Sequence, residues 1–186
     1  MRIGLLGGSF DPPHVGHLLT ASDAVDALGL DRLVLVPAAQ QPLKQGQHAP
    51  AEHRLAMTRL LADADPRLDV DPIEIERGGL SYTVDTLATY AARFPEAERY
   101  FLVGADVLPS FSRWREPARI RELATVAVMQ RNGDPVSLLE GMVAVKTRRV
   151  DVSSTEIRAR VRAGLPVRGF VTDRVADYIA AHRLYR

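Results

Sequence analysis

Short apolar segments alternate with segments of helical periodicity along this chain, and this alternation constrains the fold more than any other feature. The first apolar run covers residues 3–6 and ends at a glycine pair, and later runs cover residues 32–36, 100–103, 125–129 and 142–145. Strands that are separated by helices pair in parallel and bury both faces of their sheet. We therefore predict an α/β fold with a Rossmann-like doubly wound parallel sheet.

Helices are expected between these runs. Apolar residues at helical spacing predict a helix that begins near Val15 and stops at Gly29. Further helices are expected over residues 51–62, 83–94, 119–123, 155–163 and 173–182. Residues 68–76 alternate apolar with polar side chains, so we predict an extended segment there. The polar stretch 38–50 reads as a long loop of the kind that often carries function.

The composition is typical of an ordinary globular protein. The chain has 186 residues, of which 46% are hydrophobic and 25% are charged, so we expect one domain, 1–186, with 151–186 as a C-terminal helical subdomain. It has no cysteine, no signal-peptide pattern and no apolar run near the roughly 18 residues that a membrane span needs. A cytoplasmic location is expected, and the net charge of +1 gives no indication of a nucleic-acid partner.

Residues 8–17, GSFDPPHVGH, carry the first chemical signal. A glycine turn that leads into a helix presents backbone N–H groups and the positive dipole end, which together favour an anion. His14 and His17 are three residues apart, so both imidazoles share a face of the helix start, and Gly16 keeps that face open. Two imidazoles can donate hydrogen bonds to phosphate oxygens. Taken alone, the pair could equally be a metal site or a surface feature.

Residues 152–158, VSSTEIR, carry the second signal. Hydroxyl residues just before a helix are good N-caps, so simple capping is one interpretation. The same hydroxyls and N–H groups could bind phosphate oxygens. Arg158 lies in the first turn of the expected helix, and its guanidinium is a planar fork suited to phosphate.

The first segment resembles the GxFDPxHxGH motif of the nucleotidyltransferase superfamily, and the second resembles the ISSTx[IL]R motif, with Val152 in place of Ile. Both motifs in this order imply adenylyl transfer from ATP. The resemblance implies that two groups of side chains contact the phosphates from opposite sides, and the catalytic residues expected are His14, His17, Lys44 and Arg158. The expected ATP-binding residues are Gly8, Ser9, Phe10, Gly16, Gly104, Asp106, Arg131, Ser153, Ser154 and Thr155.

Over essentially the whole chain the sequence resembles the bacterial nicotinate-nucleotide adenylyltransferases. Residues 79–87, GLSYTVDTL, resemble that family's GPSYTxDT segment, with Leu80 where proline is usual. Residues 104–106, GAD, resemble its G[GA]D turn. The resemblance implies that Asp106 accepts hydrogen bonds from ribose hydroxyls.

The same resemblance implies a site for nicotinate mononucleotide. Trp114, the only tryptophan, would stack on the nicotinate ring. The Thr83 hydroxyl and the N–H groups of the helix that follows would donate hydrogen bonds to the nicotinate carboxylate. Tyr82 is either a binding residue or a core residue. Trp114 could also simply pack in the interior.

The loop after the second strand departs from the family pattern, which often has PPHK or PPHR where this chain has QPLK at residues 41–44. The histidine is missing, and Lys44 remains as the expected phosphate contact. The partners expected are ATP, with Mg²⁺ arriving on its phosphates, and nicotinate mononucleotide, while homo-oligomerisation stays open. The alternatives are pantetheine-phosphate adenylyltransferase, which has the same two motifs, and a non-catalytic nucleotide sensor.

Overall fold

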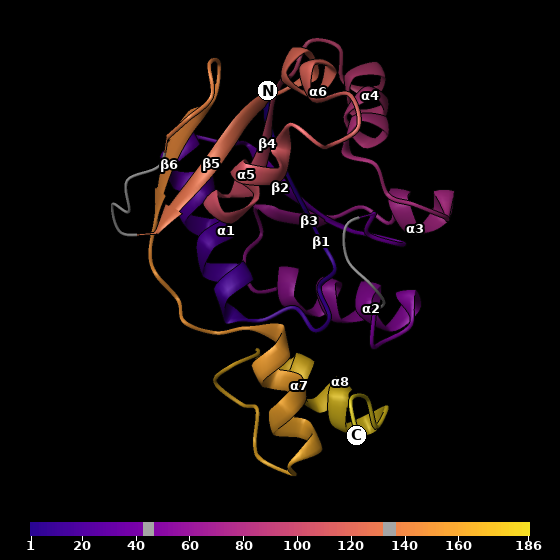
Figure 1. Ribbon diagram of the computed structural model, residues 1–186. Helices are drawn as coiled ribbons and strands as arrows, with labels where there is room; N and C mark the ends of the chain where they lie inside the picture. Colours follow the sequence, from indigo (N-terminus) through magenta and orange to yellow (C-terminus); the bar gives the residue numbers. More distant parts are fainter. Residues whose placement is uncertain (43–46, 132–136) are drawn as a thin grey trace.

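The computed structural model describes residues 1–42, 47–131 and 137–186, with the side chain of Arg131 left out. Within these residues six parallel strands form one sheet in the order β3-β2-β1-β4-β5-β6 (Figure 1). The strands are β1 (Arg2–Gly8), β2 (Arg32–Pro37), β3 (Leu68–Val70), β4 (Glu98–Gly104), β5 (Thr125–Arg131) and β6 (Val143–Thr147). The predicted doubly wound α/β fold is confirmed.

The winding of the sheet reverses beside its central strand. The chain forms β1, β2 and β3 outward in one direction, and then returns to pair β4 on the other side of β1 before adding β5 and β6. The connections that leave β1 and β4 therefore run to opposite sides and open a crevice beyond their carboxyl ends. In doubly wound sheets this crevice is where ligands bind.

Helices cover both faces of the sheet (Figure 1). Gly29 ends the first helix in the left-handed conformation, at φ 59°, as the sequence predicts. The helices are α1 (Val15–Leu28), α2 (Ala51–Ala62), α3 (Ile73–Arg77), α4 (Thr83–Arg93), α5 (Leu108–Phe111), α6 (Pro117–Leu123), α7 (Ser154–Arg162) and α8 (Asp173–Ala181), with a 3₁₀ turn, η1 (Ala105–Val107), before α5. None of these helices is both long and apolar enough to cross a membrane.

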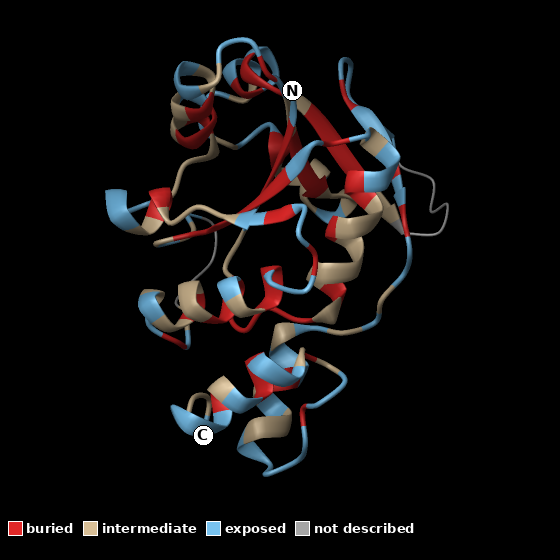
Figure 2. Ribbon diagram, turned by 180° about the vertical axis from the view of Figure 1, so that it is seen from behind, coloured by how far each residue is buried: buried red, intermediate tan, exposed pale blue. Residues whose placement is uncertain are grey.

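Alternate residues of each strand supply two hydrophobic cores. In β2, Leu33 and Leu35 belong to the core under α1 and α2, whereas Val34 and Val36 belong to the core under α4 and α6. The buried residues accordingly follow the sheet and the inner faces of the helices (Figure 2). Complete burial of each such side chain contributes about 1.5–3 kcal/mol relative to exposure.

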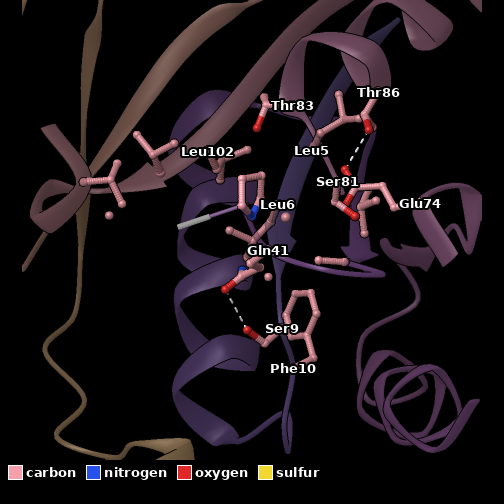
Figure 3. Close-up of a pocket in the computed structure, with 18 of the residues that line it drawn as sticks. Leu5, Leu6, Ser9, Phe10, Gln41, Glu74, Ser81, Thr83, Thr86 and Leu102 are labelled. Carbon is pink, nitrogen blue, oxygen red and sulfur yellow. Dashed lines mark hydrogen bonds between the residues drawn. The ribbon is translucent and has the colours of Figure 1, made fainter. Parts of the chain in front are cut away.

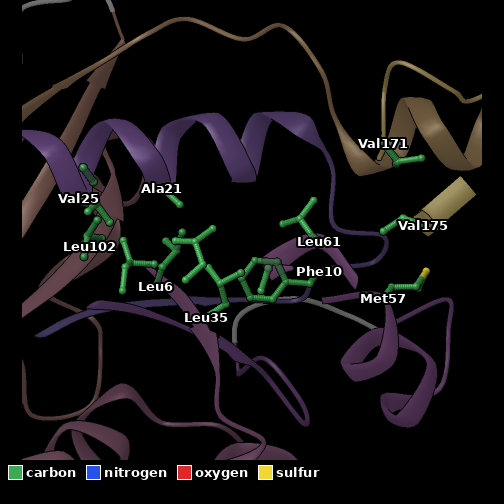
Figure 4. Packing of buried hydrophobic residues seen from close by; sticks show 14 of the residues in the cluster. Leu6, Phe10, Ala21, Val25, Leu35, Met57, Leu61, Leu102, Val171 and Val175 are labelled. Carbon is green, nitrogen blue, oxygen red and sulfur yellow. The ribbon is translucent and has the colours of Figure 1, made fainter. Parts of the chain in front are cut away.

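The last two helices join the first of these cores. Val171 and Val175 pack in the same cluster as Phe10, Met57 and Leu61 (Figure 4). Figure 1 places α7 and α8 at the end of the molecule opposite the N-terminus. The segment containing Phe10 is therefore enclosed between α2 and the C-terminal helices.

The prediction for residues 68–76 was wrong in part. Only Leu68–Val70 forms a strand, and Ile73–Arg77 forms α3. The Asp71 carboxylate accepts the Ile73 N–H at 2.9 Å, which closes a turn and starts the helix. The prediction also missed η1 and α5, because a 3₁₀ turn and a four-residue helix are too short to show helical periodicity.

Candidate active site

A cavity of about 930 Å³ lies in the crevice beyond the carboxyl ends of β1 and β4 (Figure 3). Its size is within the range of about 300–1,000 Å³ that is typical of sites for small ligands. Residues of both motifs line it together with the residues expected to bind the acceptor. The predicted site residues on its wall are Gly8, Ser9, Phe10, His17, Tyr82, Thr83, Gly104, Asp106, Trp114, Ser154, Thr155 and Arg158.

The other predicted site residues are placed differently. His14 and Gly16 lie beside His17 but are not among the residues that line the cavity, and Ser153 is an exposed residue at the start of α7. Lys44 lies outside the described residues, so its predicted phosphate contact stays a prediction. Arg131 ends β5, and its side chain is likewise outside the described part of the chain.

The two motif histidines are in contact, with ring centroids 3.8 Å apart. The backbone N–H of His14 donates to Nδ1 of His17 at 3.2 Å. Because Nδ1 accepts, the neutral His17 ring carries its hydrogen on Nε2, which makes that atom a donor for a phosphate oxygen. His17 also lines the cavity.

His14 is only 8% exposed, and burial lowers its pKa to about 4. Its ring is therefore neutral at pH 7 in the ligand-free protein. Gly16 makes room for this ring, since a Cβ at that position would lie 2.9 Å from His14 Nδ1. A side chain at position 16 would displace the imidazole.

The second motif holds the backbone of the first. Ser154 Oγ donates to the Pro12 carbonyl at 2.8 Å, and Arg158 donates to the Asp11 carbonyl at 2.7 Å and to Thr155 Oγ1 at 3.1 Å. Arg158 Nε is buried without a hydrogen-bond partner among the described residues. The motifs are thus physically joined although about 140 residues separate them.

Ser153 caps α7, and its Oγ accepts the Glu156 N–H at 3.1 Å. This contact is the simple capping interpretation that the sequence left open. It places Ser153 at the helix start, whereas Ser154 and Thr155 are the hydroxyl residues that line the cavity.

An aromatic group forms the wall near α5. The Trp114 ring lies 5.5 Å from Phe111 and 6.0 Å from Phe101, in tilted and edge-on arrangements. Trp114 therefore packs against other aromatic side chains, which is the second interpretation that the sequence left open. It also lines the cavity. Tyr82 lines the same cavity and holds the Arg115 guanidinium 4.8 Å above its ring.

The start of α4 faces the cavity with Thr83 and Thr86 (Figure 3). Thr86 Oγ1 donates to the buried Glu74 carboxylate at 2.6 Å and accepts from Arg77 at 3.1 Å. Ser81 Oγ accepts the Ala39 N–H at 2.9 Å, which ties the loop after β2 to this helix start. Sequence reasoning gave no role to Thr86 or Glu74.

The end of β4 carries the predicted ribose contact. Asp106 is exposed in η1, and its carboxylate lies so close to Gly104 that a Cβ there would overlap Oδ1. Glycine at this position lets the acidic side chain fold back over the strand end, within the cavity wall.

Sequence reasoning also missed a buried polar group beneath the first motif. Arg54 is 1% exposed and donates to the carbonyls of Ser9 at 2.8 Å, Ala39 at 3.3 Å and Ala49 at 3.2 Å. A signal was present, because Arg54 shares the buried face of α2 with residues three and seven positions later, Met57 and Leu61. A charged residue on such a face indicates a buried partner.

Comparisons with known proteins agree with this geometry. The cytidylyltransferase-like family model matches residues 5–160. A probable nicotinate-nucleotide adenylyltransferase of Gemmatimonas aurantiaca is 51% identical and covers all of this chain and 93% of the relative. One of Thermus thermophilus is 46% identical over the full length of both chains.

Solved structures match the fold at much lower identity. The nicotinic acid mononucleotide adenylyltransferase of Plasmodium falciparum, complexed with NaAD, superposes with a TM-score of 0.81 at 17% identity, and the match covers 99% of this chain and 97% of that one. A sequence identity of 17% supports a shared fold and nothing further. The sequence matches, which extend over both motifs and the segments around Thr83 and Trp114, place the chain in the cytidylyltransferase-like family and among the nicotinate-nucleotide adenylyltransferases.

Proposed function

We propose that this protein transfers the adenylyl group of ATP to nicotinate mononucleotide, which yields deamido-NAD and pyrophosphate for NAD biosynthesis. One observation carries the proposal: a single cavity is lined by both phosphate-binding motifs and by the aromatic group at Trp114. The names of the relatives support the acceptor. We propose that residues 151–186 serve as a helical subdomain of one nucleotidyltransferase domain, 1–186.

In the proposed reaction a phosphate oxygen of nicotinate mononucleotide attacks the α-phosphorus of ATP. The bond from that phosphorus to the oxygen bridging the α- and β-phosphates breaks, and pyrophosphate leaves with the electron pair. The acceptor phosphate is its own nucleophile, so the protein has to position the two substrates and stabilise charge. His17 Nε2–H would donate to a phosphate oxygen, and the guanidinium of Arg158 would face the triphosphate from α7.

Acceptor recognition would use the opposite wall. The Trp114 ring offers a face for the nicotinate ring, and N–H groups at the start of α4, beside Thr83, would bind its carboxylate. Asp106 would accept hydrogen bonds from ribose hydroxyls. These roles rest on the position of each residue in the cavity wall and on the family membership.

Mg²⁺ is expected to enter bound to the oxygens of ATP, as part of that substrate, where it neutralises triphosphate charge. Within the described ranges no three His, Cys, Asp or Glu side chains come together as a group that could hold a metal ion. We therefore assign no side chain of this chain to the metal.

The His17→Ala variant tests the catalytic role. Loss of one preorganised donor is expected to lower kcat for pyrophosphate release about 10²–10³-fold. His53→Ala is the matched control, because His53 lies on α2 and its Nδ1 contacts the Tyr178 hydroxyl, at 2.9 Å. Near-wild-type turnover in His17→Ala would refute the histidine role, and a wild-type protein that binds ATP without releasing pyrophosphate would be a sensor.

A further inference from the structure

The Asp11 carboxylate joins three parts of the chain that lie far apart in the sequence. It is 4% exposed, and it accepts the His48 N–H at 2.6 Å, the Ala49 N–H at 3.1 Å and the Tyr185 hydroxyl at 2.8 Å. The Asp11 carbonyl also accepts from Arg158 at 2.7 Å. Both the side chain and the backbone of this residue are therefore fixed, three positions before His14.

Arg54 supplies positive charge near the same loop. Burial lowers the pKa of Arg54, and the nearby charge of Asp11 acts in the opposite direction. The guanidinium donates to the Ser9 carbonyl of this loop and to the Ala39 and Ala49 carbonyls of the segment after β2. A buried carboxylate and a buried guanidinium thus hold the loop, and each would be costly to leave without its hydrogen bonds.

Tyr185 reaches Asp11 from the segment after α8. Its φ of 66° lies in the left-handed region, as does that of Arg183 at 54°, and this backbone conformation is costly for residues other than glycine. Burial, followed by the charge of Asp11, raises the pKa of Tyr185 well above its usual value, so the hydroxyl stays a donor. The ring packs against the core cluster that contains Phe10.

We propose that Tyr185 is a positioning residue for adenylyl transfer, because its hydroxyl holds Asp11 and Asp11 holds the loop that carries His14. This inference rests on the function proposed above. The loop is short and tightly bonded: Ser154 holds the Pro12 carbonyl, and the Phe10 ring lies 5.0 Å from the His17 ring. A shift of Asp11 would therefore move His14 and His17, and a displacement of about 1 Å can cost on the order of 100-fold in rate.

The Tyr185→Phe variant keeps the ring and its packing and removes only the hydroxyl. We expect kcat to fall about tenfold while KM for ATP and for the acceptor change by less than about twofold, because alignment is lost and binding groups are kept. Tyr178→Phe is the matched control, since it also removes one hydroxyl contact, to His53, from the same C-terminal region. Its kcat should stay within about twofold of wild type.

A double-mutant cycle with Asp11→Ala tests whether Tyr185 acts through Asp11. The double variant should be about as slow as Asp11→Ala alone, because the acceptor of the Tyr185 hydroxyl is already gone. Losses that multiply would mean that Tyr185 acts independently, and this would overturn the proposal. So would a Tyr185→Phe variant whose only defect is a lowered Tm and whose kcat returns to the wild-type value at a temperature where it is folded.

The histidine ring resonances in NMR spectra give a readout that does not need turnover. Tyr185→Phe should shift the His14 and His17 resonances of the ligand-free protein more than Tyr178→Phe does, and equal spectra would overturn the proposal. If the wild-type protein prefers another acceptor, the proposal of nicotinate mononucleotide as acceptor is wrong. The kcat values of the variants are then compared with the preferred acceptor as the substrate. If the wild-type protein has no turnover, the role in adenylyl transfer fails with the proposed function, and the ring shifts then decide only whether Tyr185 positions the two histidines.

Discussion

We expect acid to destabilise this protein because the His14 ring is buried, and a substitution of His14 should remove this contribution to the pH dependence of stability. The ring is 8% exposed, and burial lowers its pKa to about 4 from the value of 6.5 that it has when unfolded. Below pH 6.5 the His14 ring is protonated in the unfolded chain but stays neutral in the folded protein, so the free energy of unfolding falls as the pH falls. The fall ends near pH 4, where the ring of the folded protein is protonated as well. The loss from this group between pH 7 and pH 5 is about 2 kcal/mol.

Urea denaturation of the wild-type protein and of His14→Asn, at pH 7 and at pH 5 in the same salt, measures this loss. Asparagine cannot titrate and is a good N-cap, which suits the position of His14 before α1. The free energy of unfolding of the wild type should drop by about 2 kcal/mol more than that of His14→Asn. Parallel losses in the two proteins would show that the His14 ring is not held neutral by burial.

Two further substitutions test the buried group and the acceptor wall. Arg54→Met should lower the free energy of unfolding by about 3 kcal/mol, because three carbonyls lose a buried donor, whereas Arg59→Met on the exposed face of α2 should change it by less than about 0.5 kcal/mol. Denaturant titration measures both, and equal losses would contradict the role of Arg54. Trp114→Ala should raise KM for nicotinate mononucleotide about tenfold and leave KM for ATP within about twofold, and a parallel rise in both would contradict ring stacking.

The fold was largely predictable because its signals are local. A strand that is buried on both faces reads as a continuous apolar run, as residues 32–36 do, and β2 begins at the predicted residue. The helix stop at Gly29 is equally local, since the left-handed cap needs glycine. The strand order is set by packing between distant segments, and no single run encodes it. Asp71 starts α3 through a side-chain contact that the periodicity of residues 68–76 does not reveal.

The two motifs predicted which distant residues lie together. His17 and Arg158 line one cavity as the two motifs require, although about 140 residues separate them. The contacts that hold these motifs in place were not predictable, because Asp11, Arg54 and Tyr185 come together only in the folded chain; the sequence indicated only that Arg54 is buried. The carboxylate of Asp11 was visible in the motif, but only its contact with Tyr185 indicates what it does.

The central claim concerns the adenylyl acceptor, and one comparison tests it most directly. Pyrophosphate release from ATP is measured with the wild-type protein over a range of concentrations of nicotinate mononucleotide, nicotinamide mononucleotide or phosphopantetheine, in parallel. The cavity wall of Tyr82, Thr83 and Trp114 predicts the highest kcat/KM with nicotinate mononucleotide. Preference for phosphopantetheine, or no release with any of the three, would contradict the proposed function.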